Sequence, residues 1–281
     1  MNNSTSSIWV LYHANCLDGY ASAWSAWKFF GNMAHYQPVR HRMPVPKIPK
    51  GATIYLLDFC YPMEQMLMVA SNAHQVIVLD HHASTYADYI AHRNQADLPV
   101  NLAFYFEQTQ SGCVMAWNYF FPDSAMPVLL AHIQDRDLWL HQLSGTAEIT
   151  HALYSLLPIP FSDFEQIEFT ELYRKGSILH KQHQLHVKRL LTSHHKIVLN
   201  GVIGLAANAP MRFSSELGEA LAKISGTYGL VYRFHEKRRL YECSLRSIGE
   251  FDVSALAVHF GGGGHRNAAG FSVIEMSSAC K

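Results

Sequence analysis

Residues 75–84 read QVIVLDHHAS, and this stretch decides the fold. Four apolar residues without polar alternation, 76–79, are typical of a strand buried on both faces of a parallel sheet. Asp80, His81 and His82 follow directly. Polar groups at the end of a buried strand need partners, because burying them unpaired is costly. We therefore predict a functional cluster at the end of this strand.

The same arrangement occurs twice upstream. SIWVLYH (7–13) and ATIYLLDF (52–59) are short apolar runs that end in His13 and in Asp58 with Phe59. ASAWSAWKFFG (21–31) and PMEQMLMVASNA (62–73) have the composition of helices, so strands alternate with helices. In open α/β sheets the ligand crevice lies outside the carboxyl ends of the strands. These polar residues are therefore expected to meet at one edge of a parallel sheet.

The remainder predicts a helical middle and a second, smaller domain. Helices are expected around SGCVMAWNYF (111–120), PVLLAHIQDRDLWLHQL (127–143) and ELYRKGSILHKQHQLHVKRLL (171–191). From about His195 the pattern favours a smaller α/β domain with hairpin strands. The predicted organisation is an N-terminal α/β domain over 1–165, a helical linker over 166–194 and a C-terminal domain over 195–281.

The polar residues at the strand ends are suited to a metal centre. Asp58, Asp80 and Asp135 offer oxygen, and His13 and His81 offer nitrogen, a mixture that fits Mn²⁺, Fe²⁺, Co²⁺ or Zn²⁺. Two such ions about 3.5–4 Å apart generate hydroxide from water and clamp phosphoryl oxygens, with a shared carboxylate as bridge. The alternative is that each aspartate is an ordinary cap or turn residue.

The segment QDRDLW (134–139) offers two carboxylates on either side of Arg136. Positions 135 and 137 do not share a helix face, so both are not expected to reach one metal. Asp135 is the preferred ligand, with a solvated or arginine-paired acid as the alternative. Asp137 is expected to be a structural partner of an arginine or of the Trp139 region.

FGGGGHRNAAGF (260–271) is the second informative stretch. Its glycines let backbone N–H groups approach a ligand, and His265 and Asn267 add donors for an anionic oxygen. Arg246, at the end of a strand-like run, is suited to fork onto a phosphate. The alternatives are a flexible turn and a surface arginine.

Composition narrows the class of protein. The chain has 281 residues, 49% of them hydrophobic, and balances 22 Lys+Arg against 22 Asp+Glu, so no basic field for long nucleic acids is indicated. Without a basic leader or an apolar stretch of about 20 residues, we expect a cytoplasmic protein that does not enter a membrane. Five cysteines without CxxC spacing argue against a disulfide framework or a structural zinc site.

In order along the chain, HANCLDGYASA, LLDF, LDHHAS, QDRDLW and FGGGGHRNAAGF resemble the motifs of the DHH phosphoesterases with their associated C-terminal domain. The motifs span residues 13–271, nearly the whole chain. The resemblance implies a two-domain α/β enzyme. Two divalent ions, commonly Mn²⁺, would serve the hydrolysis of phosphodiester or phosphoanhydride bonds in the cleft between the domains.

The resemblance also implies roles for individual residues. His81 would ligate one ion together with Asp18, and Asp58 would bridge the two ions. His82 would face the substrate and protonate the leaving oxygen, with Asp80 supporting it or joining the metal shell. The ligands of the other ion would be His13 and Asp135. The substrate grip would comprise Arg246, Gly262, Gly263, Gly264, His265 and Asn267.

The chain departs from the family in its first motif. The family usually carries two aspartates as DxD. This chain has CLD instead, with Cys16 at the position of the first aspartate and His13 one residue closer to this motif than in the family. The site around His13 thus lacks one carboxylate. Asn15 or water could fill that position, Cys16 could bind as a soft thiolate and change the preferred ion, or Cys16 packs in the turn.

For the substrate, the GGGGH loop resembles that of members that cut oligonucleotides or nucleotide second messengers. Near-zero net charge also suits short substrates better than long polymers. We expect a phosphodiesterase or exonuclease that converts short oligonucleotides, linear dinucleotides or cyclic dinucleotides to mononucleotides. The alternatives are a non-catalytic nucleotide-binding protein with a single metal and a phosphoanhydride hydrolase acting on pyrophosphate or polyphosphate. The sequence leaves open a homo-oligomer.

Overall fold

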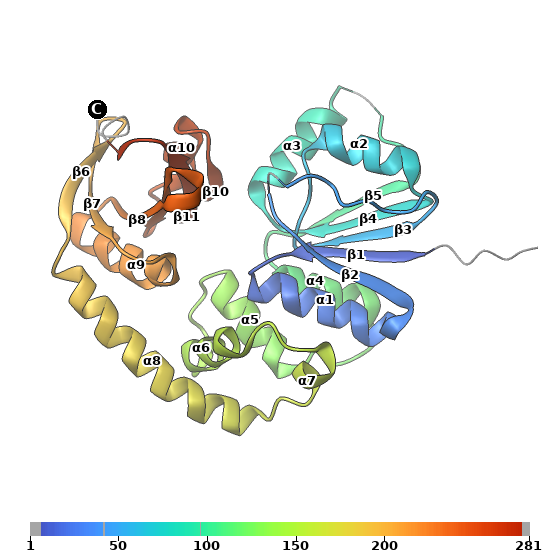
Figure 1. The fold of residues 1–281 in the computed structure, drawn as a ribbon, viewed down its shortest axis with the longest axis horizontal. Coiled ribbons are helices and arrows are strands. Elements are labelled where there is room, and N and C mark those ends of the chain that lie inside the picture. Colours follow the sequence, from blue (N-terminus) through green and yellow to red (C-terminus); the bar gives the residue numbers. More distant parts are fainter. Residues whose placement is uncertain (1–6, 42, 96, 277–281) are drawn as a thin grey trace, which may run out of the picture. The chain divides into compact units, whose positions relative to one another are not determined.

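The computed structural model describes residues 7–41, 43–95 and 97–276. The chain divides into two compact units within the helix α8 (Phe169–Leu191), between His180 and Lys181 (Figure 1). The predicted linker, 166–194, is therefore largely one continuous helix. Each unit is described by itself.

The N-terminal unit contains a five-stranded parallel sheet in the order β2-β1-β3-β4-β5. In chain order its elements are β1 (Ile8–His13), α1 (Leu17–Phe30), β2 (Ala34–Val39), β3 (Thr53–Leu57), α2 (Met63–Asn72), β4 (Gln75–Asp80), α3 (Ala83–Arg93), β5 (Leu102–Phe106), α4 (Gly112–Phe120), α5 (Val128–Asp137), α6 (Thr146–Leu156) and α7 (Phe161–Glu165). The predicted parallel sheet is confirmed.

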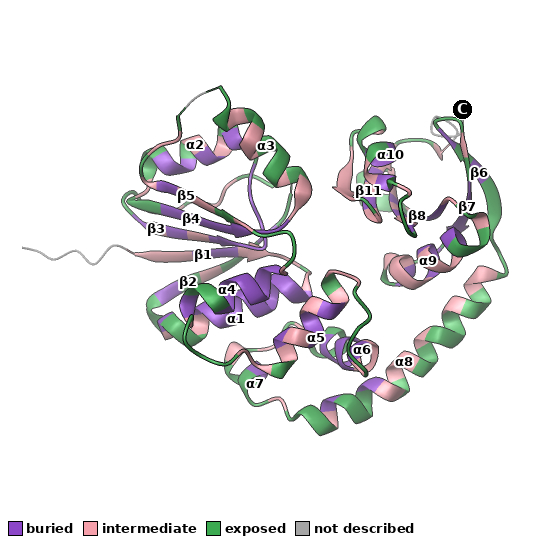
Figure 2. Cartoon of the chain, turned by 180° about the vertical axis from the view of Figure 1, so that it is seen from behind, coloured by how far each residue is buried: buried purple, intermediate pink, exposed green. Residues whose placement is uncertain are grey.

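Both faces of this sheet are covered, as the apolar strands require. Figure 1 shows α2 and α3 on one face and α1 and α4 on the other. In β4, Val76 and Val78 pack in the core that includes α2, whereas Ile77 and Leu79 pack against α1 and α4. Figure 2 shows the central strands and α1 as largely buried. The central strands are thereby fixed, and their carboxyl ends are held at one edge.

Two strands of this sheet were not expected from the sequence. β2 lies at one edge beside β1 and carries Pro38, and β5 lies at the other edge beside β4. An edge strand can accept a proline because one side of its backbone needs no ladder partner. β2, with the sequence AHYQPV, contains polar residues and a proline and so lacks a continuous apolar run, whereas β5, with the sequence LAFYF, is apolar but mostly only partly buried.

The C-terminal unit contains a six-stranded mixed sheet in the order β10-β11-β9-β8-β7-β6, in which only the β7–β8 pair is parallel among the described residues. Its elements are β6 (His195–Leu199), β7 (Val202–Asn208), α9 (Ser214–Ser225), β8 (Tyr228–His235), β9 (Leu240–Ser247), α10 (Val253–His259), β10 (Gly263–His265) and β11 (Ala268–Val273). Neighbouring residues of β7 alternate between two cores, Leu205 packing with α9 residues and Ala206 in the core that includes α10. The smaller α/β domain with hairpin strands is confirmed.

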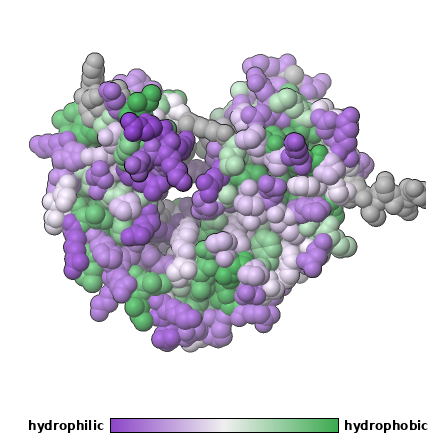
Figure 3. Space-filling model, in the orientation of Figure 1, coloured by the Kyte–Doolittle hydropathy of each residue, from purple (hydrophilic) through white to green (hydrophobic). Residues whose placement is uncertain are grey.

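Among the described residues, every helix is too short or too polar to cross a membrane. On the face drawn in Figure 3, hydrophobic residues are interspersed with hydrophilic ones. The cysteines at 16, 60, 113 and 243 are free thiols, and Cys280 lies outside the described residues.

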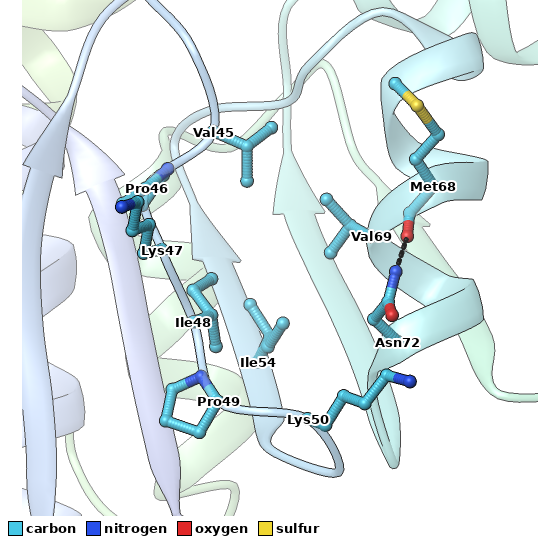
Figure 4. Close-up of a pocket in the computed structure, with 10 residues that line it drawn as sticks. All are labelled: Val45, Pro46, Lys47, Ile48, Pro49, Lys50, Ile54, Met68, Val69 and Asn72. Carbon is cyan, nitrogen blue, oxygen red and sulfur yellow. Dashed lines mark hydrogen bonds between the residues drawn. The ribbon is translucent and has the colours of Figure 1, made fainter.

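A pocket of about 360 Å³ lies between the segment 45–50 and α2 (Figure 4). Its lining is mainly aliphatic, with Val45, Ile48 and Val69 around Ile54 near the start of β3. It contains no carboxylate or imidazole. The acidic and imidazole side chains gather instead at the other end of β3, around Asp58.

Candidate metal centre

The carboxyl ends of β1, β3 and β4 bring their polar residues together. These strands are neighbours, so His13, Asp58 and Asp80 leave adjacent positions at one edge of the sheet. His13 Nδ1 lies 3.3 Å from Asp58 Oδ2, and His81 Nε2 lies 3.1 Å from Asp58 Oδ1. The sequence prediction of a common edge therefore holds for these residues.

Asp58 occupies the centre of the cluster. It is 1% exposed, adopts a left-handed backbone (φ 53°), and its N–H donates to the Leu79 carbonyl at 2.9 Å. Burial alone would raise the pKa of Asp58, but hydrogen bonds from His13 and His81 outweigh it and hold that pKa well below its usual range. Each carboxylate oxygen faces a different histidine, which is the placement that a bridging ligand requires.

Asp18 is held by the start of α4. Its Oδ2 accepts the Gly112 N–H at 2.6 Å and its Oδ1 accepts the Cys113 N–H at 2.9 Å, so a helix N-terminus fixes the carboxylate. A Cβ at position 112 would lie 2.5 Å from Asp58 Cβ and 2.9 Å from Asp18 Oδ2. Only glycine fits there. Sequence analysis did not identify this support for Asp18.

Three carboxylates surround one imidazole nitrogen. His81 Nε2 lies 3.1 Å from Asp58, 3.5 Å from Asp137 and 3.7 Å from Asp18. Burial lowers the pKa of His81, but the Asp58 hydrogen bond and the charges of Asp137 and Asp58 raise it to about 9. Burial, followed by the charge of Asp18, raises the pKa of Asp137 to about 8.

This group fits a divalent cation. A single N–H cannot satisfy three carboxylates, and the acids repel one another. A metal ion bound by oxygen and imidazole donors would relieve that repulsion. We call Asp18, Asp58, His81 and Asp137 the oxygen-rich site.

Asp135, the predicted ligand, does not join the cluster. It is 2% exposed, and its carboxylate accepts hydrogen bonds from the Gln142 N–H (2.7 Å), the Leu143 N–H (3.3 Å) and the Thr146 hydroxyl (2.6 Å). Asp135 therefore holds the chain between α5 and α6. Asp137, two residues further along at the end of α5 and expected to be a structural partner, instead places its carboxylate 3.5 Å from His81 Nε2.

His82 is held by Asp80. His82 Nδ1 donates to Asp80 Oδ1 at 2.6 Å, and the same oxygen accepts the His81 N–H at 2.9 Å. Burial lowers the pKa of His82, but the charge and hydrogen bond of Asp80 raise it to about 10. Asp80 Oδ2 is buried, and none of the described residues donates a hydrogen bond to it. This pair presents a protonated imidazole on a fixed support.

A second donor group lies on the other side of Asp58. Ligand atoms of His13, Cys16 and Asp58, one from each, lie within 4.8 Å of one another, and we call these three residues the mixed-donor site. Cys16 directly precedes α1 as its N-cap residue. Burial raises the pKa of its thiol well above the ordinary value, and the charges of Asp58, Asp137 and Asp18 raise it further.

His41, which sequence analysis did not single out, extends the cluster at its rim. Its ring centroid lies 5.5 Å from that of His13 and 6.3 Å from that of His82, and it packs on Phe59 at 4.8 Å. Desolvation, followed by the charges of His13 and His82, lowers the pKa of His41 to about 4. His41 lies just after β2. Recognising that edge strand in the sequence would have placed His41 at the same edge of the sheet.

In the C-terminal unit, the guanidinium of Arg246, a predicted substrate residue, is held in one orientation by hydrogen bonds. It lies on β9, and its guanidinium donates to the Ser244 hydroxyl (2.9 Å), the Leu245 carbonyl (2.8 Å) and the Ser215 hydroxyl (3.0 Å). These bonds orient its planar fork near the start of α9. Such an orientation suits recognition of a phosphate.

Several residues of the Gly-rich hairpin, residues 260–271, make contacts within the fold that the sequence did not predict. The Asn267 amide donates to the Ser247 hydroxyl (2.9 Å) and the Gly249 carbonyl (3.0 Å), and so ties down the turn after β9. A Cβ on Gly262 would lie 2.1 Å from the Gly270 carbonyl, and one on Gly264 would lie 2.5 Å from the Ala268 carbonyl. These glycines are needed for close strand packing.

Two predicted positions of the hairpin keep room for a ligand role. Gly263 has nothing within 4 Å of a Cβ built on it. His265 ends β10 opposite Ala268 and is only partly buried. Gly263 and His265 thus remain, with Arg246, the predicted contacts to a substrate.

Comparisons with known proteins bear on the fold. No family model matches the chain. It is 28% identical over 299 residues to protein R106 of Acanthamoeba polyphaga mimivirus, described as uncharacterized, covering 94% of this chain and 66% of R106. The chain therefore spans slightly less than two thirds of that relative's length.

Two solved structures resemble the chain. An exopolyphosphatase-related protein from Bacteroides fragilis matches with a TM-score of 0.50 and 16% identity, over 98% of this chain and 89% of the other. The pGpG-specific phosphodiesterase PggH from Vibrio cholerae matches with a TM-score of 0.43 and 12% identity, over 97% and 95%. The Bacteroides match shows a shared fold, which confirms the predicted two-domain α/β class.

Proposed function

We propose that this protein is a divalent-metal-dependent phosphoesterase of the DHH type that hydrolyses short oligonucleotides or dinucleotides to mononucleotides. The observation that carries the proposal is the position of Asp58, with one oxygen at His13 and the other at His81, between two groups of potential metal ligands. A shared carboxylate flanked by two donor sets is the arrangement that two-metal phosphoryl transfer needs.

The chain's own residues would hold the ions in the oxygen-rich and mixed-donor sites. Asp58 belongs to both, and the α4 N-terminus fixes Asp18 in the first of them. Mn²⁺ is suited to the oxygen-rich donors. When bound, divalent ions supply a water-derived nucleophile and neutralise phosphoryl oxygens.

His82 provides the proton for the leaving group. Asp80 accepts the Nδ1 hydrogen bond at 2.6 Å and stabilises the imidazolium, so Nε2 carries the proton that is transferred. When the phosphorus–oxygen bond to the leaving nucleoside breaks, that oxygen takes the proton, and His82 is left neutral. Asp80 holds the ring in place throughout.

Substrate recognition is assigned to the C-terminal unit. The oriented guanidinium of Arg246 is suited to a substrate phosphate, with His265 as a further donor. The balanced charge of the chain favours short substrates, because long nucleic acids are held mainly by cationic surfaces. The replacement of a family carboxylate by Cys16 supports a second candidate, a nucleotide-binding protein that does not hydrolyse its ligand.

One panel of assays tests the proposal. The purified chain would be incubated with Mn²⁺ and, separately, a linear dinucleotide, a cyclic dinucleotide, longer RNA, DNA, pyrophosphate and polyphosphate. We expect mononucleotides from the dinucleotides and no turnover after chelation. Tight dinucleotide binding without hydrolysis under any divalent ion would favour the binding protein, and cleavage of pyrophosphate or polyphosphate alone would favour phosphoanhydride chemistry.

A further inference from the structure

The mixed-donor site and the oxygen-rich site differ in chemistry although they share Asp58. The mixed-donor site offers one sulfur, one imidazole nitrogen and one carboxylate. The oxygen-rich site offers three carboxylates around His81. Thiolate sulfur is a soft ligand that favours ions such as Zn²⁺, whereas carboxylate-rich sites suit Mn²⁺.

The backbone places Cys16 where its sulfur can reach the shared carboxylate. Asn15 takes a left-handed conformation (φ 59°), which turns the chain from the end of β1 into α1. A Cβ on Gly19 would lie 2.3 Å from the His13 carbonyl, so the first turn of α1 packs directly on His13. This close approach brings the Cys16 thiol, the His13 ring and Asp58 within reach of one ion.

The three buried cysteines, Cys60, Cys113 and Cys243, lie in different surroundings from Cys16. Cys60 contacts the Tyr61 carbonyl, Cys113 contacts the Ser111 hydroxyl, and Cys243 contacts the Met276 sulfur. Among the described residues, the groups able to hold a metal include no cysteine but Cys16. A thiol surrounded by carboxylates in a donor group is distinct from a thiol that packs in a core.

Resting on the proposed function, we propose that the protein is a mixed-metal enzyme in which His13, Cys16 and Asp58 hold a thiophilic divalent ion such as Zn²⁺. The oxygen-rich site holds Mn²⁺. On binding, Cys16 Sγ releases its proton to solvent and forms a sulfur–metal bond, with no change in oxidation state. The pair of sites thereby distinguishes its two ions by ligand softness.

Cobalt titration of the metal-free full chain tests the sulfur–metal bond directly. Co²⁺ bound by a thiolate gives a near-ultraviolet charge-transfer absorption that oxygen and nitrogen ligands do not give. We expect this band in the unaltered chain and in the control Cys243→Ala, whose thiol lies in the C-terminal unit. The band should be absent from Cys16→Ser and Cys16→Ala, with circular dichroism confirming that at least one of them is folded.

Competition then tests selectivity. Zn²⁺ should displace the thiolate-bound Co²⁺ from the unaltered chain, whereas excess Mn²⁺ should leave the band in place. In Cys16→Asp, calorimetry should show the Zn²⁺ preference over Mn²⁺ at this site reduced by at least the roughly 10–100-fold by which altered outer-shell partners change metal affinity.

The proposal is overturned if Co²⁺ binds the unaltered chain without the band, or if the band persists in Cys16→Ser. Hydrolysis is measured separately, so the two proposals can fail independently. If the band is present but no hydrolysis is seen, the proposed enzymatic function is contradicted and the thiolate site is supported. Hydrolysis with Mn²⁺ in both sites and no thiolate band keeps the enzyme and removes the mixed-metal centre.

Discussion

The strand-end cluster of the N-terminal unit and the Gly-rich hairpin of the C-terminal unit use polar residues in opposite ways. In the hairpin, Asn267 finds carbonyl and hydroxyl acceptors, and the glycines allow strands to pack closely. In the cluster, three acids compete for His81, and Asp80 keeps a buried oxygen without a donor among the described residues.

This difference separates structural from chemical use of the same kinds of residue. A polar group whose hydrogen bonds are satisfied within the fold stabilises that fold. Like charges gathered without compensation cost stability, and they are retained where a ligand supplies the missing charge. The cluster is therefore the place to look for metal-dependent chemistry, and the hairpin mainly shapes the fold.

The largest effect is expected from Asp58→Asn. This change keeps the size of the side chain but removes the charge shared by both sites, so metal-dependent hydrolysis should fall to background. Activity with saturating Mn²⁺ and a linear dinucleotide measures the loss, and circular dichroism checks folding. Near-normal turnover would show that Asp58 is not a bridging ligand.

His82→Ala should lower kcat by roughly 10²-fold or more, the usual contribution of a positioned proton donor. KM for a dinucleotide should change little, because the proton is transferred only as the bond breaks. His35→Ala is the matched control, since His35 is an exposed histidine packed on Trp9 at the start of β2. An equal loss in both variants would contradict the assigned role.

Asp135 and Asp137, the two acids on either side of Arg136, provide a direct comparison. Asp137→Asn should weaken metal binding by roughly 10–100-fold or more, because changing even an outer-shell partner of a metal ligand costs that much, while the metal-free protein stays folded. Asp135→Ala should instead lower the free energy of unfolding by about 1–3 kcal/mol, because it leaves buried donors unpaired. Calorimetry with Mn²⁺ and urea unfolding measure the two quantities. The reverse pattern would restore Asp135 as the ligand.

Substitutions in the hairpin and at Arg246 should also have different effects, the first on stability and the second on KM. Asn267→Ala should cost about 1–3 kcal/mol of stability through lost hydrogen bonds to Ser247 and Gly249, with little effect on KM of the intact fraction. Arg246→Ala should raise KM for a dinucleotide and have a smaller effect on bis(p-nitrophenyl) phosphate, which lacks a second phosphate. If Asn267→Ala raised KM as much as Arg246→Ala, Asn267 would have to contact the substrate as well.

The smallest effect concerns pH in the absence of metal. The pKa of His82 rises from the ordinary 6.5 to about 10, so its stabilising contribution is complete below pH 6.5 and is lost as the pH rises toward 10. The raised pKa values of His81 and Asp137 act in the same direction. The Tm in EDTA should therefore fall from pH 6.5 to 10, and less steeply in His82→Gln. A flat profile would contradict the His82–Asp80 pairing.

The central part of the site could be predicted from the sequence because continuous apolar runs identify buried parallel strands. That pattern located β1, β3 and β4 and with them the polar residues at their ends. β2, with the sequence AHYQPV, was missed because it contains polar residues and a proline, and His41 was missed with it. An edge strand lacks the continuous burial on which the prediction depended.

The choice between Asp135 and Asp137 could not be made from local sequence. The two acids lie on different faces of α5, and which face meets the cluster depends on how α5 packs against the rest of the unit. The support of Asp18 by α4 is likewise a contact across 94 positions of the chain. Packing between distant segments decides such contacts.

The glycines at 19 and 112 carry a consequence for tracing descent. Gly112 lies so close to Asp58 and Asp18, and Gly19 so close to His13, that a single methyl group on either glycine would collide with them. Cysteine can replace aspartate as a metal donor, but at positions 19 and 112 only glycine avoids the collision. Among diverged copies of this gene, we expect the two glycines to outlast several of the ligands, and to mark ancestry after the metal preference has changed.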